Sequence, residues 1–298
     1  NISPNTGVSD IVFDPTNPDV IYASSWQRRR HVYTFIAGGP ESKIYKTNDA
    51  GLTWDTIENG LPKNEKGRIA LAVSPLNSNL LFCMIEASNG KGGTFLSTTQ
   101  GASWEKQSSY STSSNYYQEI ICDPKDENTL YSMDTYAKIS RDRGKTWLNL
   151  GEQHKHVDNH AIWINPTNTK HLLVGCDGGL YETRDGATTW NYKPNLSIMQ
   201  FYRVTVDNSS PFYNVYGGTQ DNTSFGGPSR TTNNAGIVND NWFVTTGGDG
   251  FKTQVDPIDP NIIYAQSQYG GLVKFDKRSG EQVGIKPLEG KAEKAWRW

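Results

Sequence analysis

Short apolar runs alternate with turn residues along the whole chain. In six places an apolar strand ends at Asp, Asn or Ser, followed in all but one case by Pro, and a second apolar strand begins a few residues later. The first strands of these pairs are residues 11–13, 71–73, 120–122, 162–164, 204–206 and 253–255. Proline fixes its own φ angle and has no N–H to donate, so it ends a strand cleanly. The pattern therefore predicts six antiparallel strand pairs.

A second repeat interlocks with the first. Residues 47–54 read TNDAGLTW and residues 140–147 read SRDRGKTW. Two diverged copies complete the set: residues 97–104 have Thr99 at the Asp position, and residues 183–190 keep Asp185 but have Ala187 at the Gly position. The tryptophans that end the four copies are 50, 43 and 43 residues apart, and they are Trp54, Trp104, Trp147 and Trp190. A fixed period of this size is typical of a repeat architecture.

Each copy of the eight-residue motif has the chemistry of a tight hairpin. The carboxylate of Asp49, Asp142 or Asp185 can accept hydrogen bonds from backbone N–H groups within the turn. The Gly supplies a positive φ angle, and the Trp brings a large apolar surface to the start of the outgoing strand. We interpret these three aspartates and the four repeat tryptophans as structural, and not as catalytic.

Together the two repeats predict an all-β fold, a β-propeller of four-stranded antiparallel blades of roughly 40–50 residues each. Six blades are recognisable, beginning near residues 8, 68, 118, 160, 202 and 250, and residues 296–298 read as the start of a further blade. We therefore expect one propeller region over residues 1–298, cut from a longer protein. A parallel β-helix is the alternative, and it is disfavoured because its repeats are shorter and lack hairpin turns.

The eight-residue motif resembles the Asp-box, also called the BNR repeat. With residues 42–47, 156–161, 175–181, 217–222 and 247–250, it makes the whole chain similar to VPS10/sortilin-like propeller proteins of the bacterial secreted type. A more distant resemblance is to Asp-box xyloglucanases, which pair two propellers around a catalytic cleft. These resemblances imply a secreted protein, extracellular or periplasmic. The cysteine-rich module of sortilin is missing here, so its receptor function is not implied.

Composition narrows the classes of function. The net charge is −2 and the pI is near 6.2, so nothing in the charge indicates a nucleic-acid or anionic-membrane partner. No apolar run approaches the ~20 residues of a membrane span. The three cysteines, Cys83, Cys122 and Cys176, lie in apolar strands at spacings that match no zinc site, and we read them as small buried hydrophobic residues.

Polar and aromatic residues precede the innermost strands of successive blades, where a propeller would bring them to one mouth of its channel. We expect a ligand site there, formed also by the loop after the second strand of blade five. Its candidate residues are Arg68, Gln118, His160, Gln200, Tyr202, Gln220, Asp221, Asn222 and Asp249. Gly217, Gly218, Gly226 and Gly227 are expected to give that loop its freedom. The other possibility is that these polar groups only solvate the channel mouth.

Two functions are consistent with such a mouth. The first is a non-catalytic module that binds or scaffolds a protein or a glycan. The alternative is a glycoside hydrolase of the xyloglucanase type, completed by a second propeller, for which Asp158, Asp221 and Asp249 are the candidate carboxylates. We predict no metal site, because His154, His156 and His160 lie where a loop enters a strand. No cofactor is predicted, although the Asp- and Asn-rich turns leave calcium as a possibility.

Overall fold

The computed structural model describes residues 2–31, 33–63, 65–113, 115–196 and 198–288. The chain divides into two compact units, Asn1–Pro194 and Asn195–Trp298, which we describe one at a time. The predicted further blade at residues 296–298 lies outside the described residues, and the single region 1–298 stays a prediction.

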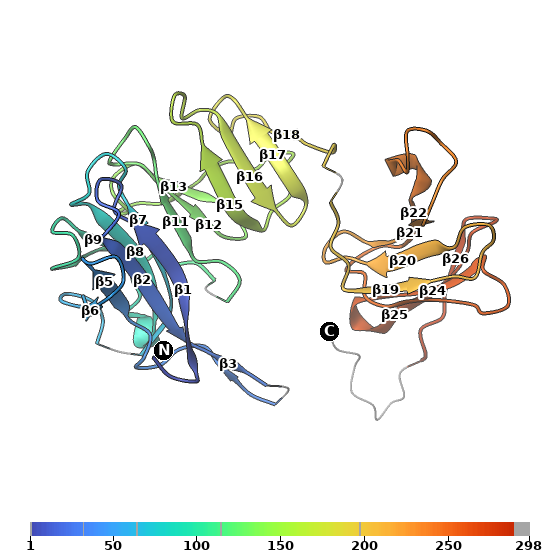
Figure 1. The fold of residues 1–298 in the computed structure, drawn as a ribbon, viewed down its shortest axis with the longest axis horizontal. Coiled ribbons are helices and arrows are strands. Elements are labelled where there is room, and N and C mark those ends of the chain that lie inside the picture. Colours follow the sequence, from blue (N-terminus) through green and yellow to red (C-terminus); the bar gives the residue numbers. More distant parts are fainter. Residues whose placement is uncertain (1, 32, 64, 114, 197, 289–298) are drawn as a thin grey trace. The chain divides into compact units, whose positions relative to one another are not determined.

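The described part of the first unit contains four four-stranded antiparallel sheets, each built from one contiguous stretch of chain (Figure 1). The strands of these sheets are, in order, β1 (Thr6–Phe13), β2 (Ile21–Gln27), β5 (Ile44–Thr47) and β6 (Asp55–Thr56); β7 (Lys66–Val73), β8 (Leu81–Ala87), β9 (Gly93–Ser97) and β10 (Glu105–Ser108); β11 (Glu119–Cys122), β12 (Leu130–Met133), β13 (Lys138–Ser140) and β14 (Leu148–Asn149); and β15 (Asn159–Ile164), β16 (Leu172–Cys176), β17 (Gly179–Thr183) and β18 (Asn191–Tyr192). A short ribbon, β3 (Arg29–Arg30) and β4 (Phe35–Ile36), extends from the first sheet.

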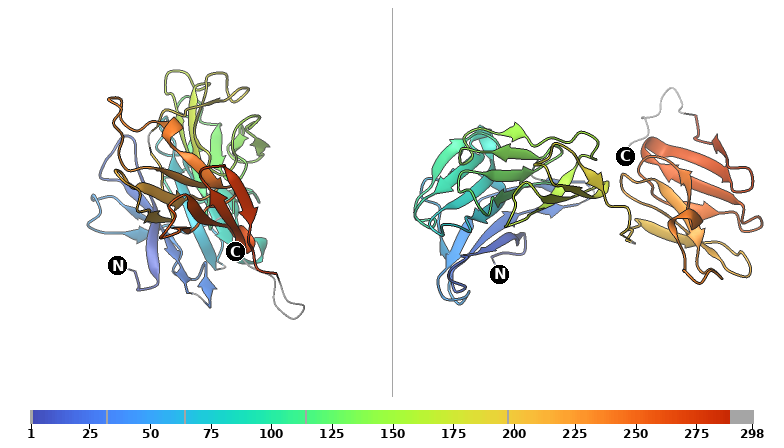
Figure 2. Two further views of the ribbon diagram at one scale, coloured as in Figure 1. Left: turned by 90° about the vertical axis from the view of Figure 1, so that its right-hand side faces the viewer. Right: turned by 90° about the horizontal axis from the view of Figure 1, so that it is seen from above.

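The described part of the second unit contains two more sheets of the same kind, visible from two directions in Figure 2. Their strands are β19 (Arg203–Val206), β20 (Asn214–Gly218), β21 (Ser224–Pro228) and β22 (Phe243–Thr246), followed by β23 (Thr253–Val255), β24 (Ile262–Ser267), β25 (Gly271–Asp276) and β26 (Glu281–Gly284). The helical elements among the described residues are three 3₁₀ turns, η1 (Ser88–Gly90), η2 (Asn239–Asn241) and η3 (Gln268–Gly270). The predicted all-β architecture of four-stranded propeller blades is confirmed. In the part of the chain that is described, no helix has the length and apolar character that crossing a bilayer requires.

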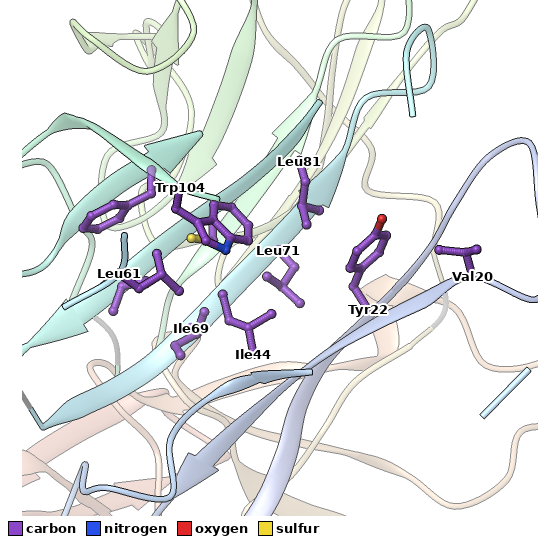
Figure 3. Close-up of a cluster of buried hydrophobic side chains, with 11 residues drawn as sticks. Val20, Tyr22, Ile44, Leu61, Ile69, Leu71, Leu81 and Trp104 are labelled. Carbon is purple, nitrogen blue, oxygen red and sulfur yellow. The ribbon is translucent and has the colours of Figure 1, made fainter. Parts of the chain in front are cut away.

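Apolar side chains fill the spaces between successive sheets of the first unit. One cluster joins the first and second sheets through Tyr22, Ile44, Leu71, Leu81 and Trp104 (Figure 3). A second cluster joins the second and third sheets, and a third joins the third and fourth. Burial of one large apolar side chain contributes roughly 1.5–3 kcal/mol. Each blade is therefore stabilised mainly by packing against the neighbouring blades.

Polar contacts fix the innermost strand of the second blade to the first two strands of the first blade inside this packing. The Leu71 N–H donates to Asp10 Oδ2 at 2.8 Å, and Ser24 Oγ donates to the Ile69 carbonyl at 2.7 Å. The Ser24 hydroxyl is fully buried, so this bond between two sheets satisfies a group that has no access to water. These bonds set the register of β7 against the first blade.

The eight-residue repeats form the hairpins that lead into the fourth strands of the first four sheets. Asp142 accepts the Thr146 N–H at 2.8 Å and the Thr146 hydroxyl at 2.6 Å, and Ser140 Oγ accepts the Gly144 N–H at 2.8 Å. Asp49 and Asp185 make the same pair of bonds, to Thr53 and Thr189. Thr99 makes both contacts with one oxygen instead of two: its hydroxyl accepts the Ser103 N–H at 3.1 Å and lies 3.2 Å from the Ser103 hydroxyl.

The two central residues of each hairpin have positive φ angles. In the first repeat they are Ala50 at 56° and Gly51 at 92°, as in a type I′ turn. The fourth repeat has the glycine at the first of these positions, so that Gly186 and Ala187 both have φ of 72°. The fourth repeat thus has a residue with a side chain at the second central position, where the other three repeats have glycine, and that residue carries backbone strain.

The four repeat tryptophans start equivalent strands, as predicted, but their indoles have two kinds of partner. The indoles of Trp54 and Trp147 donate to Gly51 and Gly144 of their own hairpins, at 3.0 and 3.2 Å. Trp104 instead donates to the Ile57 carbonyl, beyond the end of the preceding sheet, at 3.0 Å. Trp190 does the same with Gly151 at 2.9 Å. Only these last two are buried, at 6% and 8% exposure.

We expect Asp142→Ala to lower the free energy of unfolding by about 1–2 kcal/mol, because it leaves the Thr146 N–H and the hairpin hydroxyls without their acceptor. Urea unfolding followed by circular dichroism measures this. Lys145→Ala, an exposed substitution in the same turn, is the control and should change little. Equal stability of Asp142→Ala and wild type would contradict the structural role of the repeat aspartates.

Candidate functional site

The predicted site residues fall in both units. Arg68, Gln118, Asp158 and His160 belong to the first, and Gln200, Tyr202, Gln220, Asp221, Asn222 and Asp249 belong to the second. Their convergence on one mouth therefore stays a prediction across the two units. Within each unit, the structure brings some of them together.

In the second unit, the turn between β20 and β21 lies against the segment that joins β22 to β23. The Thr223 N–H donates to the Gly248 carbonyl at 3.0 Å, and the Gly250 N–H donates to the Thr219 carbonyl at 2.9 Å. The two loops are thus joined through their backbones. As expected from the meander, Asp221 and Asp249 become neighbours in space.

Glycines permit this contact by their lack of a side chain. A Cβ atom added to Gly218 would lie 2.1 Å from the Gly250 carbonyl carbon, and one added to Gly250 would lie 2.6 Å from the Gly218 Cα. The expectation that Gly217, Gly218, Gly226 and Gly227 give a mobile loop its freedom is wrong. All four lie in β20 or β21, where bulky neighbours or another backbone occupy the space of a side chain.

Asp249 is the buried carboxylate of this loop pair. It is 1% exposed, its Oδ1 accepts the Asp221 N–H, and its own N–H donates to Gln268 Oε1 at 2.8 Å. Its Oδ2 has no hydrogen-bond partner among the described residues. Burial raises the pKa of Asp249, and the negative charge of Asp221 adds to this effect. Its burial is at odds with direct ligand binding, so we assign it to holding Asp221 in place.

The loop that Asp249 holds is strained. Asp221 has a φ of 58° and Thr223 a φ of 72°. Positive φ is unusual for any residue with a side chain and most unusual for a β-branched one. Residues held in such conformations cluster at functional sites, because surrounding contacts must enforce them. Here Asp221 and its neighbours Gln220 and Asn222 are exposed at the tip of the turn.

Beside this loop lies an open cavity of about 460 Å³. Aromatic side chains form much of its wall: Tyr202 and Phe251 stack with ring centroids 5.5 Å apart and planes within 9°, and Tyr269 is 63% exposed. Arg203, Lys252, Gln266 and Gln268 supply polar groups. The cavity and the loop are connected, since the Tyr202 hydroxyl donates to Gln220 Oε1 at 2.9 Å and Gln268 holds Asp249.

The remaining predicted residue of this unit is Gln200, which lies exposed on the segment that leads to Tyr202. Phe251, Gln268 and Tyr269 were not predicted. Residues 268–270 follow the second strand of blade six, as Gln220–Asn222 follow that of blade five. That topological equivalence was the signal in the sequence that would have identified Gln268 and Tyr269, whereas Phe251 precedes the first strand of blade six, as Tyr202 precedes that of blade five.

In the first unit, Asp158 and His160 meet through the buried Tyr117. The Tyr117 hydroxyl donates to Asp158 Oδ1, and the phenol ring stacks on the His160 imidazole with centroids 5.2 Å apart. His160 Nε2 in turn lies 2.8 Å from Asp177 Oδ1. Burial, together with the bond to Asp158, raises the pKa of Tyr117. Among the described residues, no cluster of three His, Cys, Asp or Glu side chains has the geometry of a metal site.

The structure corrects the expectation for Gln118, which is 1% exposed. Its amide donates to the carbonyls of Arg68 and Met84, at 3.1 and 3.0 Å, and its Oε1 accepts the Thr112 hydroxyl. With both N–H groups used and no access to solvent, this side chain ties the second sheet to the third. Arg68 keeps partial exposure, 19% for its side chain, and its guanidinium donates to the Tyr117 carbonyl at 2.8 Å.

No protein-family profile matches the chain. Two curated xyloglucanases are similar to it. That of Paenibacillus sp is 23% identical over 275 residues, which cover 89% of this chain and 23% of the relative. That of Hypocrea jecorina (strain QM6a) is 30% identical over 251 residues, which cover 72% of this chain and 28% of the relative. The chain thus spans about a quarter of the length of each.

Among solved structures, the GH74 xyloglucanase from Xanthomonas campestris aligns with 93% of this chain and 45% of its own, at 16% identity and a TM-score of 0.46. YCF48 from Cyanidioschyzon merolae aligns with 94% of this chain and 85% of its own, at 10% identity and a TM-score of 0.42. The resemblance to xyloglucanase-like propellers is supported by the sequence similarities. The finer resemblance to VPS10/sortilin-like proteins stays a prediction.

We expect Asp249→Asn to raise the melting temperature at pH 7. The pKa of Asp249 is raised in the folded state, so its ionisation opposes folding once the pH exceeds its ordinary value of 3.8. Below that pH the carboxyl is protonated in both states, and the difference from wild type should vanish. Asn keeps an oxygen for the Asp221 N–H. Calorimetry at pH 7 and at pH 3 measures the effect.

Asp49→Asn is the matched comparison, with the opposite sign. Bonds from Thr47 and Thr53 lower the pKa of Asp49 to about 2 in the folded protein. Its carboxylate therefore stabilises the fold above pH 3.8, and this contribution is lost as the pH falls through about 2. Asp49→Asn should lower the melting temperature at pH 7. If both variants shifted stability in the same direction, the assignment for Asp249 would fail.

Proposed function

We propose that this chain is the glycan-binding part of a xyloglucanase-like glycoside hydrolase, and that it binds a β-glucan backbone at the cavity of the second unit. The observation that carries this proposal is an open, aromatic cavity beside an exposed carboxylate, in a chain similar over most of its length to two xyloglucanases. This is the alternative function considered above. It is favoured over a protein scaffold because both curated relatives are named for a polysaccharide.

The cavity has the chemistry that sugar rings require. The faces of pyranose rings carry C–H groups that pack on aromatic side chains, and Tyr202, Phe251 and Tyr269 supply such side chains. Hydroxyl groups around the sugar ring need donors and acceptors, which the amides of Gln266 and Gln268 provide. A volume of about 460 Å³ suits one or two sugar units.

Asp221 is the carboxylate within reach of a bound chain, because it is exposed at the tip of its turn. Asp249 is a positioning residue: it is buried, and it holds the Asp221 backbone. Hydrolysis of a glycosidic bond uses two carboxyl groups on either side of it. We propose that Asp221 contributes one of them and that the longer protein contributes the other. A polymeric substrate also favours a site of action outside the cell.

Calorimetric titration of the 298-residue chain with xyloglucan oligosaccharides tests the binding. Tyr269→Ala should weaken binding about tenfold, or ~1.4 kcal/mol, by removing one aromatic face. Tyr136→Ala, at an equally exposed tyrosine of the first unit, should leave affinity unchanged. Failure of wild type to bind any β-glucan oligosaccharide at millimolar concentration would contradict the proposal.

Release of reducing ends from xyloglucan tests the hydrolytic part separately in the full-length protein. Asp221→Asn should abolish release while binding persists. A different result is that the Asp221→Asn variant releases reducing ends as fast as the wild type, while the Tyr269→Ala variant releases none. The second unit would then bind the glycan without contributing a catalytic residue.

A further inference from the structure

The first unit has a second cavity, of about 520 Å³, that the proposed function does not use. It lies beside the basic run of residues 26–31 and is lined by Trp26, Arg28 and Arg68, with Ser9, Asn115 and the backbone of Gly7 and Val8. All of these residues belong to one unit, and none lies in the cavity of the other.

Two guanidinium groups share one indole in this cavity. The Arg28 guanidinium carbon lies 5.0 Å from the centroid of the Trp26 ring, and that of Arg68 lies 5.9 Å from it. Arg28 also lies 5.3 Å from the centroid of Phe35. The Trp26 N–H is fixed by a bond to the Ala37 carbonyl at 2.8 Å. Cation–π contacts with an anchored ring thus hold two like charges beside one open space.

The two arginines differ in how many carboxylates lie close enough to offset their positive charge. Arg68 has Glu119 at 3.4 Å and donates to the Tyr117 carbonyl, and its charge also interacts with the Asp10 carboxylate. Arg28 has no carboxylate within 4 Å among the described residues, and its Nε is a buried donor with no acceptor there. The Arg28 charge thus has no carboxylate partner among the described residues, and a carboxylate bound in the cavity would supply one.

We propose that this cavity binds the carboxylate of an acidic sugar, a uronic acid residue of a polysaccharide. A planar carboxylate matches the two-donor edge of a guanidinium, which makes arginine the preferred partner for it. The amide of Asn115, the hydroxyl of Ser9 and the backbone at Gly7 suit the hydroxyl groups of the same ring. The carboxylate follows from the two arginines alone. The choice of a sugar as its carrier rests on the proposed function.

The test titrates methyl glucuronide into the ¹⁵N-labelled 298-residue protein and follows the arginine Nε–H resonances by NMR. The Arg28 resonance should shift on binding, because the carboxylate lies against its guanidinium group. Methyl glucoside, which has the same ring without the carboxylate, should bind at least tenfold more weakly. Equal affinity for the two sugars would overturn carboxylate recognition.

Arg28→Gln should weaken glucuronide binding at least tenfold. Arg30→Gln removes the same charge from an exposed residue two positions further along and should have no effect. Equal losses would mean non-specific attraction and overturn the site. Should Arg28→Gln fail to fold, Arg28→Lys replaces it, keeping the charge but losing the two-donor edge, and should also weaken binding.

Three further measurements distinguish the Arg28 cavity from the Tyr269 cavity and define its ligand. Tyr269→Ala should leave glucuronide binding intact, so the two proposals can fail independently. If an N-acetyl-aspartate amide bound as well as the glucuronide, the proposal that a sugar carries the carboxylate would be wrong. If inorganic phosphate bound more tightly than the glucuronide, the proposal that the cavity recognises a carboxylate would be wrong.

Discussion

The burial of each sheet face against the next sheet is the constraint on which the rest of this structure depends. A single four-stranded blade has two faces and cannot bury either by itself. In the first unit the blades bury them in shared clusters, such as the one formed by Tyr22, Leu71 and Leu81. In the second unit the requirement is stricter, because Gly218 and Gly250 approach so closely that a methyl group has no space. Regular packing of this kind leaves the loops at the blade ends as the positions where the sequence is free to vary.

The two candidate sites use that freedom in different ways. In the second unit, a rigid blade end holds a loop in a conformation that it would not adopt alone, and a buried polar group enforces it. Asp249 does this for the turn that bears Asp221, whose φ is 58°. In the first unit no backbone strain is involved: the half-buried Trp26 ring holds Arg28 and Arg68 through cation–π contacts. Each site has one unfavourable feature: backbone strain at Thr223 in one, and repulsion between Arg28 and Arg68 in the other. The protein tolerates both because the packed blades beneath them are stable.

The repeats in the sequence were sufficient to predict the blades, because a hairpin with Asp49 or Asp142 is a local structure determined by residues a few positions apart. The loop contact between Asp221 and Asp249 also followed, since a meander returns its second strand to the end where the first began. Side-chain burial did not follow from the sequence. Gln118 was predicted to face a ligand and instead ties two sheets together, and Gly217 and Gly218 were predicted to loosen a loop and instead permit close packing. Those properties depend on side chains and backbone from other strands, some in the same blade and some in neighbouring blades, as do the aromatic contacts of Phe251.

The central claim is that a glycan binds in the second unit, against the aromatic wall beside Asp221. A crystal structure of the chain with a bound xyloglucan oligosaccharide tests it most directly. The account predicts a sugar ring packed on Tyr269 or on the stacked Tyr202 and Phe251 rings, with a sugar oxygen within hydrogen-bonding distance of the Asp221 carboxylate. An oligosaccharide bound only elsewhere, with this cavity open and accessible in the same crystal, would contradict it.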